Sequence, residues 1–182
     1  MGTWEWTVLN FIQENIRNEI LDGIMPAITA LGNAGMIWII LACALMISKK
    51  HRTTGMILVA AMVIDAVLCN GILKPLVDRM RPFEVNPDIV LLISPPQDPS
   101  FPSGHTAISF AVVTVLYLRK EKYWYISFVL AVLIAFSRMY LYVHFPTDVL
   151  GGCVLGILCG GLAVMLFKKL DRSNAVNRKE EK

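Results

Sequence analysis

Three short polar clusters interrupt an otherwise apolar chain, and each holds residues able to bind an anion or move a proton. In chain order they are Lys74 to Arg81-Pro82, then Pro102-Ser103-Gly104-His105, then Ser137-Arg138 with His144 and Asp148. Each cluster lies at the edge of a hydrophobic segment, and together they contain two of the three histidines. This inventory predicts a site that handles phosphate at a membrane surface.

The third cluster offers a nucleophile. His144 and Asp148 are four residues apart, the spacing of neighbours on one helical face, although Pro146 predicts that the helix begins between them. A carboxylate bound to one imidazole nitrogen fixes the tautomer and leaves the other nitrogen free to attack. An isolated pair of this kind is equally compatible with a structural histidine, so the surrounding residues must decide.

Those surroundings are cationic. Arg138 lies six residues before His144, and Lys74 and Arg81 lie at the same expected end of an earlier apolar segment. Three cations at one membrane face are costly unless they bind an anion there. Phosphate matches this set, since charge gathers on its equatorial oxygens during transfer and arginine binds them bidentately.

The second cluster adds hydrogen-bond donors. Ser103 is placed as the N-cap of a helix whose free N–H groups favour an anion. Gly104 allows the backbone to approach a ligand closely. His105 would then lie near the phosphate as a general acid for the leaving oxygen.

Taken together, the clusters resemble the three motifs of the type 2 phosphatidic acid phosphatase family of membrane lipid phosphatases. Those motifs read K-x6-R-P, P-S-G-H and S-R-x5-H-x3-D, and here all three occur in order and at family spacing. The resemblance covers residues from about 25 to 167. The joint pattern is highly specific.

This resemblance implies a role for each motif residue. His144 would be the nucleophile that forms a phosphohistidine, Asp148 would orient it, and His105 would protonate the leaving group and later help water attack. The phosphoryl oxygens would be held by Lys74, Arg81, Ser103, the Gly104 backbone and Arg138. The family needs neither metal nor cofactor, which fits a site with cations where a metal site has carboxylates.

The rest of the chain must position these residues in a bilayer. Its 182 residues suit one domain, and 55% of them are hydrophobic, with a mean hydropathy of +0.58. The net charge of +3 does not indicate a nucleic-acid partner. The four cysteines all lie in apolar runs without C-x-x-C spacing, so we expect small core residues rather than disulfides or zinc ligands.

Five apolar stretches predict an all-α bundle of transmembrane helices at about 24–48, 54–73, 103–118, 123–142 and 147–167. The first is interrupted by Pro26 and by Gly32-Asn33-Ala34-Gly35. It is expected to be a short helix that leads into a shorter span, and a re-entrant turn there would raise the number of spans to six. The expected domain covers residues 24–167.

The distribution of basic residues predicts the orientation. The linkers 49–52 and 119–122 and the tail 168–182 contain 12 of the 17 lysines and arginines, and they alternate so as to share one side. The positive-inside rule makes that side the cytoplasm of a bacterial cell. The three polar clusters are then extracytoplasmic.

Residues 1–23 are expected to form an amphipathic helix, because apolar positions recur every three or four residues between 4 and 21. Either it lies in the membrane interface or it packs against the bundle. No cleavable signal peptide is indicated. Gly152, Gly156 and Gly160 form a small-residue face for close helix packing, and the polar tail 171–182 is expected to be disordered.

The loop 82–101 contains Ile89–Ile93, which could enter lipid and contact substrate or could serve structure alone. Five other polar or aromatic residues carry separate expectations. Asp65 is expected to be a hydrogen-bonded structural residue, and Arg79 to snorkel or to touch lipid headgroups. His51 is expected to be solvated, and Tyr140 and Tyr142 to anchor the chain at the interface.

The expected activity is hydrolysis of a lipid phosphate or diphosphate at the outer face, with undecaprenyl diphosphate preferred on chain length and orientation. Phosphatidylglycerophosphate and phosphatidate remain alternatives, because the motifs bind only the phosphate. A lipid phosphotransferase is a further alternative. The related vanadium haloperoxidases are soluble, which the apolar stretches argue against, and a scaffold or drug-resistance transporter with a dead site would show a broken motif. Oligomeric state is left open.

Overall fold

The computed structural model describes residues 2–180, with side-chain environments up to Asp171 and at Ser173, and every regular element in that part of the chain is helical. In chain order the elements are α1 (Thr3–Phe11), η1 (Ile12–Ile16), α2 (Glu19–Leu31), η2 (Asn33–Gly35), α3 (Met36–Ile47), α4 (Arg52–Ala66), η3 (Val67–Leu73), α5 (Lys74–Val77), α6 (Pro82–Val85), α7 (Gly104–Leu118), α8 (Trp124–Tyr140) and α9 (Pro146–Glu180). The all-helical prediction is confirmed.

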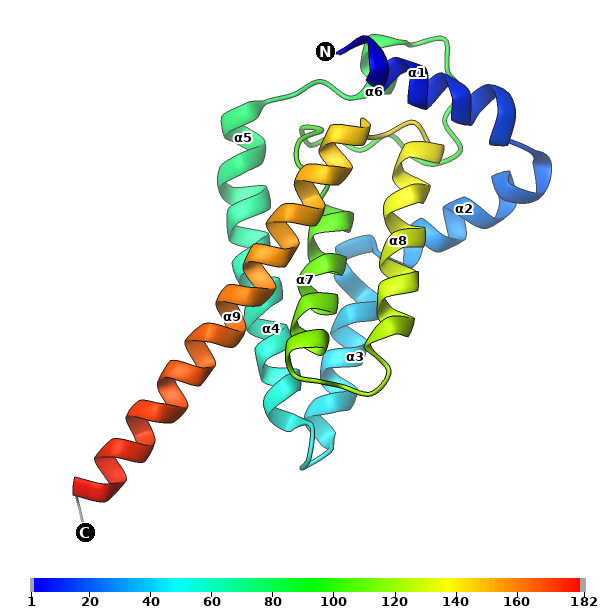
Figure 1. Cartoon of the computed structure of the whole chain (residues 1–182). Helices are drawn as coiled ribbons and strands as arrows, with labels where there is room; N and C mark the ends of the chain where they lie inside the picture. The colour runs from blue at the N-terminus through cyan, green and yellow to red at the C-terminus, as the bar shows by residue number, and fades with distance from the viewer. Residues whose placement is uncertain (1, 181–182) are drawn as a thin grey trace.

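Helix α7 is the centre of the bundle, surrounded by α3, α4, α8 and α9 (Figure 1). Its inward positions are small or β-branched, with Ala107, Ala111 and Val112 fully buried. On α3, Trp38 is buried and donates from its indole nitrogen to Ser109 Oγ at 2.9 Å, which satisfies the one polar atom of that ring. The apolar core therefore holds α7, which begins at the second polar cluster, in a fixed register.

The glycine face of α9 packs directly on α7, as the sequence predicts. A Cβ added to Gly152, Gly156 or Gly160 would meet backbone carbonyl oxygens of α7. These three positions let the two backbones approach closely. This contact places the start of α9, with Asp148, beside the start of α7.

The first apolar stretch is bent rather than straight. Helices α2 and α3 meet at 48° across η2, where Ala34 and Gly35 have positive φ values of 51° and 69°. Two other helical segments, Arg52–Val85 and Pro146–Asp171, are long and apolar enough to cross a membrane, while α7 and α8 are shorter apolar helices. The number of spans therefore stays a prediction.

Between α4 and α5 the helix widens into a π-turn at η3. Pro75 lies directly beyond it and lacks the N–H that would bond to the Gly71 carbonyl, while its ring would press on that carbonyl. The wider turn relieves this conflict, and π-turns of this kind are frequent at functional sites. Lys74 follows the wide turn as the first residue of α5, and Asp78, with φ of 43°, ends α5 as its C-cap.

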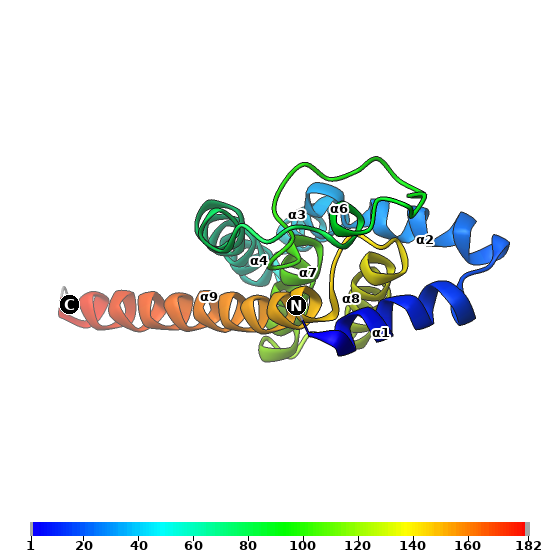
Figure 2. The same cartoon turned by 90° about the horizontal axis from the view of Figure 1, so that it is seen from above.

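The N-terminal segment forms a cap over the end of the bundle where the polar clusters meet (Figures 1 and 2). The single helix expected over 4–21 is divided, because η1 ends at Ile16 and the extended residue Arg17 follows it. Asn18 then caps a new helix by accepting from the N–H groups of Ile20 and Leu21. Leu9 of α1 is fully buried. The N-terminal segment therefore packs against the bundle, which was one of the two predicted alternatives.

The turn 141–145 between α8 and α9 lies beneath this cap. Tyr142 and Phe145 pack with Leu9, and the Trp6 ring meets Phe145 edge-on at 5.0 Å. Tyr140 and Tyr142 are each 1% exposed, so the prediction that they anchor the chain at the membrane interface is wrong. Their rings are instead covered by the N-terminal segment and by the loop after α6.

The two basic linkers contact each other at the opposite end of the bundle. His51 Nδ1 lies 2.8 Å from a carboxylate oxygen of Glu121, and Thr54 donates to the other oxygen at 2.8 Å, so His51 is not simply solvated as expected. Helix α9 continues to Glu180, which contradicts the disorder predicted from residue 171 onward. Extending an existing helix avoids the cost of nucleation, which explains why polar residues follow it. Residues 181–182 of that prediction lie outside the described part.

Candidate active site

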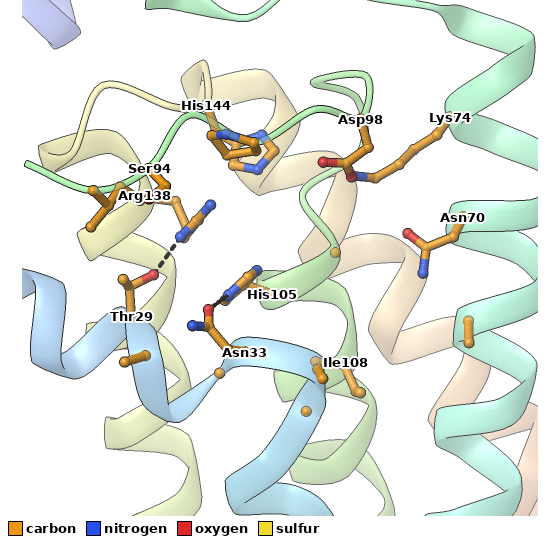
Figure 3. A pocket seen from close by; sticks show the side chains of 18 of the residues that line it. Thr29, Asn33, Asn70, Lys74, Ser94, Asp98, His105, Ile108, Arg138 and His144 are labelled. Atoms are coloured by element: carbon orange, nitrogen blue, oxygen red, sulfur yellow. Dashed lines mark hydrogen bonds and ion pairs between the residues drawn. The ribbon is translucent and has the colours of Figure 1, made fainter. Parts of the chain in front are cut away.

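A cavity of about 640 Å³ opens where the three polar clusters meet (Figure 3). Its walls include six of the eight residues predicted for the site: Lys74, Arg81, Gly104, His105, Arg138 and His144. The other two, Ser103 and Asp148, are fully buried behind these walls. The structure thus brings together residues from α5, the start of α7, the end of α8 and the turn before α9.

His144 presents one ring nitrogen to the cations and the other to acceptors. Its Nε2 lies 3.2 Å from Arg81 Nη1, a group that only donates, so Nε2 carries the lone pair. Its Nδ1 lies 3.6 Å from Asp148 Oδ2 and 3.5 Å from Ser100 Oγ. The arrangement selects the Nδ1–H tautomer and leaves Nε2 as the free base.

Asp148 is held in place by donors from three parts of the chain. Oδ2 accepts from Ser100 Oγ at 2.5 Å and from the Phe145 N–H at 2.8 Å, which also caps the start of α9. Oδ1 accepts from Arg79 Nη1 at 2.6 Å. The carboxylate therefore caps the start of α9 and also lies beside His144 Nδ1. Its contacts within the protein fix its position without a ligand.

The turn that carries His144 is strained at one residue. Tyr142 has φ of 60°, a left-handed conformation that costs of the order of 1–3 kcal/mol for a bulky side chain. The surrounding structure enforces it, because Tyr142 is buried and the Val143 N–H donates to the Arg138 carbonyl at 3.1 Å. The reversal brings His144 back beside Arg138.

The three predicted cations differ in how they are engaged. Lys74 pairs with the carboxylate of Asp98, and Arg81 donates to the same carboxylate from Nη2 at 3.0 Å and to the Val143 carbonyl from Nη1 at 2.7 Å. Arg138 donates to Thr29 Oγ1, and its Nε has no partner among the described residues although the side chain is buried. A buried guanidinium with an unused donor beside a cavity indicates an anionic ligand.

His105 lies on the cavity wall opposite His144, with its Nε2 2.9 Å from Asn33 Oδ1 (Figure 3). Because an amide oxygen only accepts, Nε2 carries the proton in this contact. Asn33 belongs to η2, so the bend between α2 and α3 reaches the site. Nδ1 is the histidine nitrogen that remains for a ligand.

Ser103 occupies the N-cap position of α7, but its hydroxyl pairs with Thr106 Oγ1 at 2.9 Å rather than with a backbone N–H. Its own N–H donates to the Asp148 carbonyl at 3.0 Å, which ties the second cluster to the third. A Cβ on Gly104 would make only ordinary contacts, the nearest at 3.7 Å to Asn70 Oδ1 and Cys69 Sγ. The glycine keeps the cavity wall free of a side chain next to the helix start.

Burial and the neighbouring charges set the ionisation of the groups in the loops. Burial, followed by the cations Arg81 and Arg138, lowers the pKa of His144 well below its usual 6.5. Burial alone would raise the pKa of Asp98, but its ion pairs with Lys74 and Arg81 outweigh this and lower that pKa to about 2. Near neutral pH the site therefore holds a neutral His144 beside an ionised Asp98.

Arg79 was expected at lipid headgroups, and this prediction is wrong. Its guanidinium donates to both oxygens of Glu5 at 2.9 Å as well as to Asp148, and it lies 4.3 Å from the centre of the Phe145 ring. Glu5 is only 3% exposed, although the sequence places it on a polar helix face. Periodicity along one segment could not reveal a partner 74 residues away.

Asp98 and Ser100 also contact the site, although neither was predicted from the sequence as a site residue. Both lie just before the second motif, and no spacing rule links them to the cations or to Asp148. The apolar part of their loop packs under the N-terminal cap through Ile89, Leu91 and Leu92, while Ile93 reaches the cavity wall. The loop is thus structural along one side and part of the site along the other.

Asp65 differs from its expected role as a satisfied structural residue. It is 3% exposed and lines the inner part of the cavity, and its Oδ1 has no hydrogen-bond partner among the described residues. Asp65 lies nine residues before Lys74 in the sequence, which corresponds to about 13 Å along the axis of α4 and η3. The cavity therefore extends from the three cations into the bundle.

Comparison with known proteins decides the family. Residues 54–172 match the family model of the PAP2 superfamily. The chain belongs to the PAP2 superfamily. The predicted family and the prediction of a lipid phosphatase are both confirmed.

Among the relatives, the undecaprenyl-diphosphatase of Sulfolobus acidocaldarius is 36% identical over 148 residues, which cover 80% of this chain and 70% of that protein. Phosphatidylglycerophosphatase B of Bacillus subtilis is 34% identical over 170 residues, covering 86% of this chain and 80% of that protein. The crystal structure of Aquifex aeolicus LpxE superposes with a TM-score of 0.79 at 32% identity, covering 90% of this chain and 96% of that one. The names of the first two relatives point to different lipid substrates.

Proposed function

We propose that this PAP2 phosphatase hydrolyses a lipid phosphate or diphosphate at the extracytoplasmic membrane face through a phosphohistidine on His144. One observation carries the proposal. A neutral imidazole nitrogen of His144, with Asp148 3.6 Å from the opposite ring nitrogen, lies on a cavity lined by three cations, and one of these, Arg138, has a buried Nε without a partner among the described residues.

In the first step the lone pair of His144 Nε2 attacks phosphorus, and the bond from phosphorus to the leaving oxygen breaks. The imidazolium character that develops at His144 is balanced by Asp148 through Nδ1–H. Lys74, Arg81 and Arg138 stabilise the charge on the three equatorial oxygens. His105, which takes up a proton on Nδ1 as the anionic substrate binds, gives that proton to the leaving oxygen, which becomes the lipid hydroxyl from a monoester or the lipid monophosphate from a diphosphate.

In the second step a water molecule attacks the phosphohistidine. His105 now accepts a proton from that water as the nitrogen–phosphorus bond breaks. Inorganic phosphate is released, and His144 returns to its neutral form. The Gly104 backbone and the other N–H groups at the start of α7, with Ser103 as N-cap, complete the oxygen-binding set. No step needs a group from outside the chain except water.

We infer five membrane spans, formed by the α2–α3 pair, the segment α4–α5, α7, α8 and α9. Residues 1–23 begin the outer cap, 24–167 form the phosphatase domain, and 168–182 form a basic cytoplasmic tail. Contact between the basic linkers through His51 and Glu121, at the end away from the cavity, supports the predicted orientation. The site then faces the outside of a bacterial cell membrane.

We infer undecaprenyl diphosphate as the substrate. The relative from Sulfolobus acidocaldarius supports this choice through 36% identity over most of the chain. Phosphatidylglycerophosphate is the second candidate, favoured by the 34% identity to phosphatidylglycerophosphatase B and by a TM-score of 0.71 to the Bacillus subtilis PAP2-type phosphatase structure. Both lipids present a terminal phosphate on an apolar anchor, which the cavity and its cations match.

The test measures phosphate release by the purified chain in detergent with EDTA from undecaprenyl diphosphate, phosphatidylglycerophosphate and phosphatidate. His144→Ala is the blank and His51→Ala, in the distant linker, is the matched histidine control. The proposal expects the His51 variant to release phosphate like wild type and the His144 variant to be at least about 10³-fold slower, as for loss of a covalent nucleophile. Release that persists in His144→Ala would exclude the phosphohistidine, and product that forms only with an added acceptor lipid would establish a phosphotransferase instead.

A further inference from the structure

The loop residue Asp98 places a carboxylate on two of the three cations that the proposed reaction needs for phosphate. Its Oδ1 accepts from Arg81 Nη2 at 3.0 Å, and its Oδ2 pairs with Lys74 Nζ. The backbone carbonyl of Asp98 also accepts from Arg81 Nε at 2.8 Å. Arg81 and Lys74 are 1% and 4% exposed, whereas the side chain of Asp98 is 52% exposed.

This asymmetry in burial indicates which partner is able to leave. The two cations are fixed in the bundle, and Asp98 reaches them from a loop whose outer side is open to solvent. Like other anions, a phosphoryl group binds best where N–H donors converge. Arg81 Nη1 lies beside His144 Nε2, and the Asp98 carboxylate takes Nη2 of the same guanidinium together with Lys74 Nζ, both residues of the cavity wall. A carboxylate and a phosphoryl group on the same two cations repel each other and compete for them.

The same loop connects Asp98 to the nucleophile. Ser100, two residues later, donates to Asp148 and lies 3.5 Å from His144 Nδ1, and its N–H donates to the Arg79 carbonyl at 2.8 Å. The backbone of the segment is therefore anchored by Ser100 on the side of Asp148 and by the carbonyls of Asp98 and Pro99, which accept from Arg81, on the cation side. The side chain of Asp98 can release Lys74 and Arg81 Nη2 while this backbone keeps its place.

We propose that Asp98 is a built-in competing anion that occupies the phosphate-binding cations between turnovers and weakens the hold of the site on phosphate. It balances the cluster of buried cations when no ligand is present, and it returns to Lys74 and Arg81 as inorganic phosphate departs. The inference rests on the proposed phosphatase function and adds a residue that sets affinity for substrate and product. Lys74 and Arg81 would bind the anionic phosphoryl group that free phosphate and a lipid phosphate have in common.

The test compares Asp98→Asn with Asp88→Asn, which removes an exposed carboxylate from the same loop. Inhibition of lipid hydrolysis by inorganic phosphate and by orthovanadate is measured for the full-length chain in detergent. Asp98→Asn is expected to lower both inhibition constants about tenfold, equivalent to about 1.4 kcal/mol of binding free energy, and Asp88→Asn is expected to leave them unchanged. A parallel fall in KM would place the competition at lipid entry as well as at product release.

Unchanged or raised inhibition constants in Asp98→Asn would overturn the inference, since they would make Asp98 neutral or an aid in orienting Lys74 and Arg81. Asp98→Ser, a second neutral variant, guards against an effect of the asparagine itself. Orthovanadate should raise the melting temperature more in both Asp98 variants than in wild type, because it binds them more tightly. This measurement needs no turnover. It therefore tests the role of Asp98 even if His144→Ala retained activity and the phosphohistidine mechanism failed.

Discussion

At the scale of single residues, the site depends on a histidine kept neutral by its surroundings. His144 is 1% exposed and is flanked by Arg81 and Arg138, so both burial and like charge oppose its protonation. A neutral ring is what a nucleophile needs. The cations that we propose to bind phosphate thus also favour an unprotonated Nε2 on the proposed nucleophile.

This argument predicts the titration of His144. Since the folded pKa is lowered well below 6.5, the ring should remain neutral as the pH falls from 8 through 6.5. Carbon-13 NMR of histidine-labelled protein, with His144→Ala to assign the signal, provides the measurement. His51 in the linker is the internal reference, and a His144 signal that titrates at or above pH 6.5 would contradict the account.

At the scale of elements, α1 reaches the catalytic centre through one salt bridge. Glu5 pairs with Arg79, which donates in turn to Asp148, so the cap is connected to the orienting carboxylate of His144. We predict that Glu5→Gln lowers kcat/KM about tenfold and also lowers the melting temperature, because a buried charged hydrogen bond is worth about 1.5–3 kcal/mol. Glu14→Gln, an exposed position in the next turn of the cap, is the matched control, and wild-type kinetics in Glu5→Gln would refute the coupling.

Acid should have the same effect as the glutamine. Burial alone would raise the pKa of Glu5, but the hydrogen bonds from Thr147 and Arg79 have a larger, opposite effect. The pKa of Glu5 in the folded protein therefore lies below the usual 4.5. The stabilisation is therefore complete above pH 4.5 and is lost as the pH falls through the folded pKa. Tryptophan fluorescence of Trp6, which packs on Phe145, follows detachment of the cap.

A second element-scale prediction concerns the contact between α7 and α9. Gly156→Ala should destabilise the protein by about 1–3 kcal/mol, because the added methyl would press on the Ala107 carbonyl and overpack the interface. Gly161→Ala is the matched control, since no atom lies within 4 Å of its added Cβ and alanine favours the helix. Thermal unfolding in detergent compares the two, and equal melting temperatures would show that the close approach is not required.

At the scale of the whole molecule, the orientation can be read by accessibility. In a background without the native cysteines, Val90→Cys lies in the loop beside the site, where residue 90 is 77% exposed, and Lys50→Cys lies in a basic linker. The proposed topology predicts that a membrane-impermeant maleimide labels position 90 in intact cells and position 50 only in inverted vesicles. The reverse pattern would place the site in the cytoplasm.

The motifs predicted which residues meet, because their chemistry has few alternative explanations. Apolar length predicted the helices, and glycine spacing predicted the α7–α9 contact. Arg79, Glu5 and Asp98 were missed for one physical reason. Their partners are far away in sequence, and a charged side chain near a helix end looks the same whether it meets water, lipid or a buried carboxylate.

The central claim is the phosphohistidine, and the most direct measurement is to trap it. Wild-type protein is mixed with substrate, quenched in alkali within one turnover and digested, and the peptide that carries His144 is examined by mass spectrometry. The account predicts one added phosphoryl group on His144 Nε2, absent from His144→Ala. A phosphoryl group on another residue, or rapid phosphate release without any protein-bound phosphoryl group, would contradict it.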